Sequence, residues 1–402
     1  MAKIKHLEID GTSANYWALL GLLGVFILGG LGSMWFMEHN GHWVTGMTNQ
    51  IVWGVPHVMA VFLIVAASGA LNVASIASVF NKTVYKPLAP LSAFLALALL
   101  AGGLAVLVLD LGRPDRLMVA MTHYNFKSIF AWNIYLYTGF FAVVGLYLLT
   151  MLGSALKPYG RLAGTLAFIW RLVLTTGTGS IFGFLVARQA YDAAIMAPMF
   201  IVFSLAYGLA CFLLVLGASF AMTGRELGPF LVRRLRNLLG VFVAGSFYMT
   251  VVHHLTNLYS AERQGVEAFL LLDGGTITSL FWLGQVVVGY ILPLALIYTP
   301  VYRDMPFAPY VAAGLTAAGG LAQMYVTIIG GQAYPLSLFP GMEASSSFFD
   351  GAINTYVPSL PESLLALSGI AIALAIVAVV VKLFRVLPVS LADETTDPHH
   401  GL

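Results

Sequence analysis

Ten long apolar runs dominate this sequence and limit what it can fold into. Each contains about 20 residues or more, which as a helix is long enough to cross the roughly 30 Å of hydrocarbon in a bilayer. The chain has 402 residues, of which 59% are hydrophobic and only 9% are charged, whereas soluble proteins carry about 25% charged residues. The pattern predicts an all-α, polytopic membrane protein with ten transmembrane helices. The runs lie at 16–37, 51–79, 90–110, 128–151, 163–187, 196–222, 238–258, 279–298, 308–329 and 364–387.

The runs follow one another closely, so we expect a single integral membrane domain over residues 1–402. It would consist of an N-terminal segment 1–15, helices within 16–387 and a tail 388–402. The first run is too long for a signal peptide and leads directly into further membrane runs. Ser128-Ile-Phe-Ala-Trp opens the fourth run much as Ser279-Leu-Phe-Trp opens the eighth. This short repeat predicts two four-helix bundles, helices 2–5 and 6–9, with helices 1 and 10 beside them.

The distribution of Lys and Arg predicts the orientation. If both termini are cytoplasmic, thirteen of the 19 basic residues lie on the cytoplasmic side and five on the other, with Arg171 inside the membrane. The positive-inside rule therefore favours a multi-pass membrane protein with both termini in the cytoplasm. Because the basic residues are spread over short loops, the net charge of +2 gives no argument for nucleic acid.

Cysteine usage restricts the redox chemistry of the chain. Cys211 is alone in the middle of an apolar run, so the sequence has no disulfide, no CxxC metal motif and no CxxCH haem-attachment motif. Any electrons that the protein handles must come from another subunit or from a bound carrier.

Two polar segments on the non-cytoplasmic side are longer than the rest, at 259–278 and 332–363. The second contains four prolines and several aromatic residues but no Lys or Arg. We expect it to form an ordered cap. It would either pack on its own bundle or offer a docking surface to a partner, and the sequence does not choose between the two.

His57 and Asp110 are the leading candidates for chemistry, because polar and ionisable residues are costly inside a membrane. His57 is expected two turns into the second helix, and Asp110 closes the third helix on the same side, so the two share a depth. Asp110 opens the stretch Asp110-Leu-Gly-Arg-Pro-Asp-Arg116, in which Arg113 is expected to pair with the carboxylate. Tyr124 and Asn125 add polar groups before the fourth helix.

Such a place suits a quinone, which needs an apolar slot, hydrogen-bond donors at its two oxygens and groups that exchange protons. An imidazole can both donate to a carbonyl and titrate near neutral pH. Pro56 removes one backbone donor and can open the helix locally. The alternative is that His57 is bonded to a neighbouring carbonyl in the core of a bundle.

The tandem His253-His254 supports a rival hypothesis. A b-type haem needs two axial histidines on facing helices at equal depth, and His57 with His253 or His254 would supply one pair. Adjacent residues on a helix point about 100° apart, so only one of the two can face a given ligand. No histidine is expected in the cytoplasmic halves of the helices to form a second pair. The tandem can also be an interfacial polar patch.

Arg171 is the deepest predicted charge, with no carboxylate expected at its depth. The following run, Thr175-Thr-Gly-Thr-Gly-Ser180, would either let helices approach closely or line a polar path. These residues are the only hint of a second rival, a solute or ion transporter with its site at mid-membrane.

The sequence resembles the NrfD/PsrC family, the membrane quinone-binding subunits of polysulfide reductase-like complexes. The resemblance is carried by a histidine near the start of the second helix together with Asp-Leu-Gly-Arg-Pro-x-Arg at the end of the third. It spans essentially the whole chain. The runs Gly41-His-Trp-Val-Thr-Gly-Met and Ala66-Ala-Ser-Gly-Ala-Leu-Asn are most similar to the branch of the family formed by the DsrP subunits of sulfur-metabolism DsrMKJOP complexes.

The resemblance implies a haem-free subunit that binds no iron–sulfur cluster itself and is not catalytic alone. It would bind menaquinone or ubiquinone near the periplasmic face and exchange electrons with a ferredoxin-like iron–sulfur partner. A cytochrome and further membrane subunits would belong to the same complex.

By position, the quinone-contacting histidine of the family falls on His57, and its acidic-Pro-Arg turn falls on Asp110, Pro114 and Arg116. The sequence departs from the family pattern in three places: Gly54 replaces an asparagine, the Thr175–Ser180 run holds neither tyrosine nor histidine, and Gln285 replaces an acid. The second quinone oxygen is left to Tyr124, Asn125 or His254. With no metal ligands expected, the predicted cofactor-binding set is Trp53, Gly54, His57, Asp110, Arg113, Tyr124, Asn125 and His254, of which His57 and Asp110 would exchange protons with the quinone.

Overall fold

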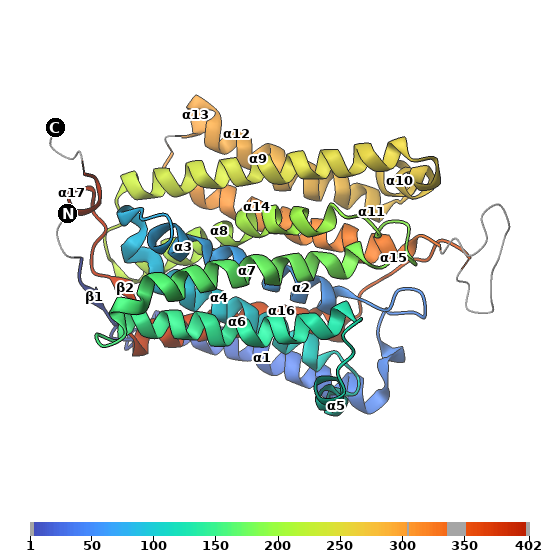
Figure 1. The fold of residues 1–402 in the computed structure, drawn as a ribbon, viewed down its shortest axis with the longest axis horizontal. Coiled ribbons are helices and arrows are strands. Elements are labelled where there is room, and N and C mark those ends of the chain that lie inside the picture. Colours follow the sequence, from blue (N-terminus) through green and yellow to red (C-terminus); the bar gives the residue numbers. More distant parts are fainter. Residues whose placement is uncertain (1–3, 304, 336–350, 399–402) are drawn as a thin grey trace.

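The computed structural model describes residues 4–303, 305–335 and 351–398. In this part of the chain, ten helical spans are long and apolar enough to cross a membrane, as the sequence predicts. They run side by side along the long axis of the molecule, with both termini at one end (Figure 1). The spans are Ala14–Asn40 (α1), Val55–Ser78 (α2 and α3), Thr83–Leu109 (η2 and α4), Ile129–Leu152 (α6), Lys157–Gly183 (η4 and α7), Met196–Thr223 (α8), Pro229–Tyr259 (α9), Thr276–Tyr298 (α11, η7 and α12), Ala308–Ala333 (α14, η8 and α15) and Leu360–Leu383 (α16).

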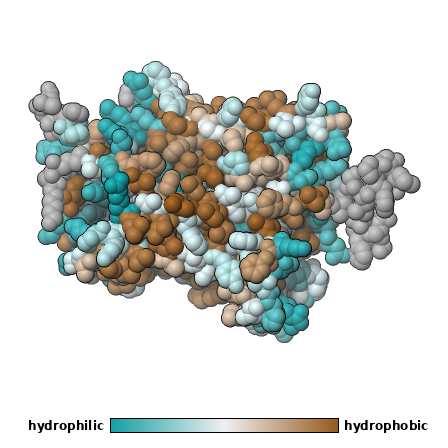
Figure 2. All heavy atoms as spheres, in the orientation of Figure 1, coloured by the Kyte–Doolittle hydropathy of each residue, from teal (hydrophilic) through white to brown (hydrophobic). Residues whose placement is uncertain are grey.

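The surface of the molecule has the pattern of a bilayer-embedded protein. Hydrophobic residues cover its middle, and hydrophilic residues gather toward both ends (Figure 2). Large apolar side chains such as Leu28 on α1, Leu149 on α6 and Val241 on α9 are exposed. Because hydrocarbon tails solvate such side chains as well as a protein core does, this belt identifies the lipid-facing surface.

Short elements connect the spans. At the end that holds the termini, β1 (His6–Leu7) pairs antiparallel with β2 (Leu387–Pro388), so the N-terminal segment and the start of the tail are joined. The guanidinium of Arg225 donates to the carbonyls of Leu7, Leu387 and Pro388. The remaining short elements are η1 (His42–Val44), η3 (Pro114–Arg116), α5 (Leu117–Thr122), η5 (Ala261–Arg263), α10 (Gln264–Ala268), η6 (Phe269–Asp273), α13 (Pro300–Arg303) and α17 (Asp393–Thr396).

Helix α2 (Val55–Ala70) lies at the centre of the packing. It contacts α4 (Ala89–Leu109) and α8 (Met196–Thr223) over most of its length, and α16 and α14 also reach it. In the first half of the chain α6 packs on α7. In the second half α8 packs on α9 and α14, and the π-helical segment η7 (Leu280–Ile291) packs on α14 and α9. α16 lies against α1, α4 and α2. This arrangement is compatible with two four-helix bundles that share one core, and the repeat that would relate them stays a prediction.

The contact between α2 and α8 depends on two glycines. A Cβ atom on Gly69 would meet the backbone of Ser204, and one on Gly208 would meet the backbone of Gly69 and Ala70. With no side chain at either position the two helix backbones come into direct contact. Small residues have this role in membrane helices, where apolar association gains little from the hydrophobic effect and depends on close packing.

The second span is interrupted between α2 and α3 (Asn72–Ser78). The hydroxyl of Ser92 on α4 donates to the carbonyl of Ala70 at 2.6 Å and accepts from the backbone N–H of Ala74 at 3.1 Å. These two backbone groups would otherwise bond each other, so a side chain from a neighbouring helix is inserted into the ladder. The insertion satisfies both groups without water.

Most predicted helix limits agree with the structure to within a few residues, with two informative exceptions. α9 begins at Pro229, nine residues before the predicted start at 238, because its first turns carry Arg233, Arg234 and Arg236 and extend beyond the apolar belt. α2 begins at Val55 with Pro56 in its first turn, so residues 51–54 are not helical. His57 is therefore in the first turn of the helix, and the prediction that it lies two turns in was wrong.

The Gly69–Gly208 contact predicts a clear stability difference between two alanine variants. Gly208→Ala should lower the free energy of unfolding by about 1–3 kcal/mol, because the new methyl group has no space against α2. Gly24→Ala is the matched control, since a Cβ atom there meets nothing within 4 Å and alanine is the better helix former. Thermal unfolding of the detergent-purified variants measures both, and equal melting temperatures would contradict the packing described.

Candidate functional site

His57 and Asp110 meet at the end of the molecule away from the termini. The Nδ1 atom of His57 lies 3.0 Å from Oδ2 of Asp110, and the Asp110 side chain is fully buried while that of His57 is 19% exposed. Asp110 caps the C-terminal end of α4, with its backbone N–H on the carbonyl of Val106. The sequence prediction that these two residues share a depth is borne out by this contact.

Neither carboxylate oxygen of Asp110 has a directed hydrogen bond within the described part of the chain. The contact with His57 is at ion-pair distance, but its angle is not that of a hydrogen bond. A buried carboxylate in this state is costly unless a cation or a further donor reaches it. The site therefore has unused capacity to accept hydrogen bonds.

A cleft of about 590 Å³ opens beside the pair. Its volume is in the range of small-molecule sites. Part of the wall is apolar and exposed, notably Trp43, Val52 and Leu111, as expected of a mouth near a membrane interface. The lining residues are His42, Trp43, Met47, Thr48, Asn49, Val52, His57, Asp110, Leu111 and Gly112.

The segment before His57 is held by a side chain from the ninth span. The amide oxygen of Gln332 accepts from the backbone N–H groups of Val52 and Trp53 at 2.9 and 3.0 Å, and its amide nitrogen donates to the carbonyl of Trp53 at 3.1 Å. Arg188 donates to the carbonyls of Gln332 and Gln50. Burial lowers the pKa of Arg188. These contacts satisfy an extended segment at membrane depth, where irregular backbone needs protein partners.

Glu362, at the start of α16, supports the same segment. It is fully buried and accepts from the Tyr356 hydroxyl at 2.7 Å and from the backbone of Gly46 at 2.7 Å. The backbone N–H of Val55 in turn donates to the Tyr356 hydroxyl. Burial, together with the bond to Glu362, raises the pKa of Tyr356, so its hydroxyl stays a donor.

This part of the predicted cap, residues 351–363, is thus ordered and packs on the bundle, whereas the stretch 336–350 lies outside the described residues. Gly54 faces the Tyr356–Glu362 pair, and a Cβ atom there would meet both oxygens. Gly54 therefore does not line the cleft. Trp53 also lies outside it, stacked on the His57 ring with centroids 6.3 Å apart.

Three other predicted residues are not part of the cleft. Arg113 pairs with Asp115 at 3.5 Å, and both are largely exposed, so the expected Arg113–Asp110 pair was wrong. The chain turns between Asp110 and Arg113 at Gly112, whose φ is +65°. Tyr124 packs edge-on against Phe126 and Tyr135 in an exposed aromatic group. The Asn125 side chain accepts from the backbone of Lys127.

The histidine that the sequence reasoning missed is His42. It lines the cleft, and its ring lies close to Gly112, where a Cβ atom would be 3.2 Å from Nε2. Nε2 is buried and has no hydrogen-bond partner among the described residues. His42 lies outside every apolar run. The signals in the sequence that could have found it are its position beside Trp43, an interfacial aromatic residue, and its place in the run Gly41-His-Trp that carries part of the family resemblance.

A second histidine–carboxylate pair lies at the same end of the molecule, in the second half of the chain. Nδ1 of His254 is 2.7 Å from Oε2 of Glu267, whose side chain is fully buried. Asn257 donates to the other oxygen of Glu267 at 2.7 Å and contacts His253 Nε2 at 3.3 Å. Arg263 binds Asn257 and the carbonyl of Asp192. His254 is thus not a partner of His57, and its prediction as part of that site was wrong.

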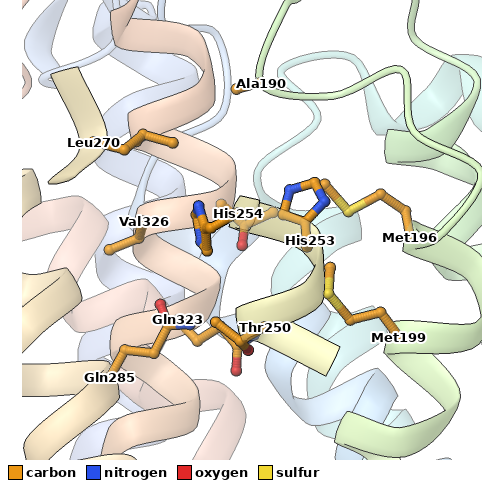
Figure 3. A pocket seen from close by; sticks show the side chains of 11 residues that line it. Ala190, Met196, Met199, Thr250, His253, His254, Leu270, Gln285, Gln323 and Val326 are labelled. Carbon is orange, nitrogen blue, oxygen red and sulfur yellow. The ribbon is translucent and has the colours of Figure 1, made fainter. Parts of the chain in front are cut away.

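Behind this second pair is a small cavity of about 30 Å³, enough for one or two water molecules. Figure 3 shows His253 turned toward Met196 and His254 toward Val326, with Gln285 and Gln323 below them. Gln323 accepts from the Tyr290 hydroxyl at 2.8 Å, and Tyr290 contacts Thr250 at 2.9 Å. His57 and the tandem histidines line separate cavities, so the structure does not bring together the axial pair considered for a haem.

Arg171 has an amide partner. It is buried, donates to the Asn72 side chain at 3.0 Å and lies over the Phe168 ring at 5.0 Å. The hydroxyl of Thr175 donates to the Arg171 carbonyl and contacts Ser68 on α2. Gly179 packs against the start of α8. The Thr175–Ser180 run therefore serves close helix packing.

The fold and this cleft define a polytopic helical membrane protein with a histidine–carboxylate pair at one end of its bundle. The chain belongs to the NrfD family, since the family model described as "Polysulphide reductase, NrfD" matches residues 43–335.

Named relatives cover most of the protein. It is 30% identical to the Hdr-like menaquinol oxidoreductase integral membrane subunit of Archaeoglobus fulgidus, over 98% of its own length and 99% of the relative. It is 27% identical to the membrane subunit of a putative dimethyl sulfoxide reductase of Halobacterium salinarum, over 92% and 91%. It is 26% identical to one of the polypeptides of the polysulfide reductase of Wolinella succinogenes, over 62% and 83%. The relatives are thus membrane subunits of oxidoreductase complexes.

The Gln332 contacts predict a local effect on the segment before His57. Gln332→Met should speed amide hydrogen exchange at residues 52 and 53 by about 5- to 150-fold, because two backbone N–H groups lose an acceptor worth about 1–3 kcal/mol. Gln264→Met, at an exposed position on α10, is the control and should leave amide exchange at residues 52 and 53 unchanged. Unchanged exchange in the Gln332 variant would show that the segment is held in another way.

Proposed function

We propose that this protein is the quinone-reactive membrane subunit of an oxidoreductase complex, and that the cleft beside His57 and Asp110 takes the quinone head group. The observation that carries the proposal is the 3.0 Å contact between these residues at the wall of a 590 Å³ cleft. Membership of the NrfD family and similarity to a menaquinol oxidoreductase membrane subunit support a quinone, with menaquinone favoured over ubiquinone.

The residues of the cleft fit such a molecule. A quinone presents an apolar ring and tail with two carbonyl oxygens, and it supplies two-electron, two-proton redox chemistry when bound. His57 would donate a hydrogen bond to one oxygen. His42 is the best available donor to the second quinone oxygen, because its Nε2 atom is buried and has no partner in the described chain. Trp43, Val52 and Leu111 give the ring and tail an apolar wall.

Asp110 and His57 together would handle the protons. The imidazole and the carboxylate lie 3.0 Å apart beside the cleft, which is the geometry that proton exchange between a quinone and a pair of acid–base groups requires. Both residues line the cleft, but His57 is partly exposed whereas the Asp110 side chain is buried, so His57 is the more accessible member of the pair. Quinol oxidation would release protons through this pair, and quinone reduction would take them up by the same route.

The site would lie at the periplasmic face of a bacterial inner membrane. Both termini are at the opposite end of the molecule (Figure 1), and the positive-inside rule assigns that end, rich in Lys and Arg, to the cytoplasm. A ferredoxin-like iron–sulfur subunit would dock beside the cleft and exchange electrons with the quinone. A haem-free subunit of DsrP type, in a sulfur-metabolism complex with a cytochrome and further membrane subunits, is the specific form of this proposal.

The two rival functions receive less support. A haem would need His57 opposite His253 or His254, and these residues line different cavities. Arg171 has two nitrogen atoms, Nε and Nη1, without a hydrogen-bond partner among the described residues. A mid-membrane transport site would also need open space around them, but Asn72 and Phe168 contact this side chain and the neighbouring glycines pack against helices. An optical spectrum of the purified protein, oxidised and reduced, tests for haem directly.

Removal of His57 is the primary test. His57→Ala should weaken binding of a quinol analogue to the purified complex by about 5- to 150-fold, because one hydrogen-bond donor is lost and the buried Asp110 carboxylate loses the imidazole that contacts it. Fluorescence quenching or calorimetric titration measures the affinity. His123→Ala is the control, since His123 is exposed at the same end and, within the described ranges, its side chain bonds only to its neighbour Thr122. Unaltered affinity in the His57 variant would discard the assignment.

The role given to His42 has its own test. His42→Phe keeps an aromatic ring but removes the nitrogen, so we expect the quinol analogue to bind about tenfold more weakly, as for one lost hydrogen bond of about 1.4 kcal/mol. His42→Gln, which retains a donor, should restore part of the affinity. If both variants bind as tightly as the unchanged protein, the second quinone oxygen has another partner and His42 only fills space.

A further inference from the structure

A second large cleft lies at the other end of the molecule, beside the termini. Its volume is about 820 Å³. It opens between the connection from α3 to α4 and the connection from α6 to α7, with the N-terminal strand along one side. Nothing in the proposed quinone chemistry uses it.

The charges in this cleft are all of one sign. Lys86, Lys157 and Arg161 line it, and none of their side chains has an ion-pair or hydrogen-bond partner in the described part of the chain. Arg385 also lines it but is paired with Glu8 at 3.0 Å. His6 is bonded to the carbonyl of Pro87. The described lining contains no Asp or Glu, so three cations converge on the cleft without an anion to balance them.

The other wall of the cleft is apolar. Ala77, Ala89, Met151 and Leu152 line it, and Leu149, one turn below Leu152 on the lipid-facing side of α6, is 56% exposed. The cleft is thus continuous with the hydrophobic belt of the protein. A soluble phosphate would need only the cations, whereas a phosphate that carries acyl chains would also use this wall.

We propose that this cleft is a binding site for an anionic phospholipid. Its phosphate lies among Lys86, Lys157 and Arg161, and the part of its acyl chains nearest the head group lies along Met151 and Leu152. Basic pockets between transmembrane helices near the membrane surface have the charge and depth that such head groups require. The bound lipid joins the α3–α4 and α6–α7 connections, both of which line the cleft.

Native mass spectrometry of the detergent-purified full chain with added phosphatidylglycerol tests the site. The double variant Lys157→Gln, Arg161→Gln should bind this lipid roughly 30-fold more weakly, because each of the two lost cations contributes about fivefold to the affinity. The matched control, Lys82→Gln with Arg233→Gln, removes two exposed cations from the same end that do not line the cleft. It should bind as the unchanged protein does.

Three results would overturn the proposal. Equal weakening in the control would show only diffuse attraction of anionic lipid to a basic end. Equal binding of phosphatidylcholine would exclude a role for the head-group charge. Displacement of phosphatidylglycerol by millimolar inorganic phosphate would show a site for free phosphate rather than for a lipid. Helical circular dichroism and quinol-analogue binding, which both variants should retain, establish that each is folded.

Discussion

Hydrocarbon supplies no hydrogen bonds, and this constraint explains where the polar residues of the chain are found. Inside the membrane each polar group must find a protein partner or lie beside a cavity. Arg171 takes an amide and an aromatic ring, and the hydroxyl of Ser92 bridges a broken helix. Among the described residues, seven buried side-chain atoms lack a hydrogen-bond partner, and four of these, on His42, His57 and Asp110, lie together at one cleft. The other three belong to Asn133 and Arg171, which do not line that cleft. This concentration of unused hydrogen-bonding capacity beside an open cleft is the basis for proposing a ligand there.

The two halves of the chain each place a histidine against a buried carboxylate at the same end of the molecule. His57 with Asp110 borders an open cleft, whereas His254 with Glu267 lies beside a cavity of water size. The chemistry of the pairs is alike, so their different access decides which one can meet a large carrier. The second pair is also more completely bonded, because Asn257 donates to Glu267. It has the character of an interior structural network.

The position of His57 depends on parts of the chain far away in sequence. The segment that leads into α2 is non-helical, and it is held by Gln332 from the ninth span and by Tyr356 before the tenth. At the other end of α2, the contact with α8 through Gly69 and Gly208 fixes its level in the core. A change at any of these positions would move the imidazole relative to Asp110 without touching either residue.

The class of the protein, its ten spans and the shared depth of His57 and Asp110 all followed from the amino-acid sequence alone. The length of each apolar run gives the spans, and the Lys and Arg residues of the loops give the orientation. Because successive helices cross the membrane in opposite directions, the depth of each residue then follows from its position in its run. Run length and charge do not say which polar loop residues reach the cleft. From the sequence, several loop residues were as good candidates for the site as His42: Arg113, Tyr124, Asn125 and His254. Their side-chain directions depend on turns, on the positive φ of Gly112 and on partners such as Asp115 and Glu267. Only the folded molecule brings together groups such as Gly46 and Glu362, which are 316 residues apart in the sequence. At the ends of membrane helices both water and protein can bind each polar group, so local sequence alone does not decide which of the two does.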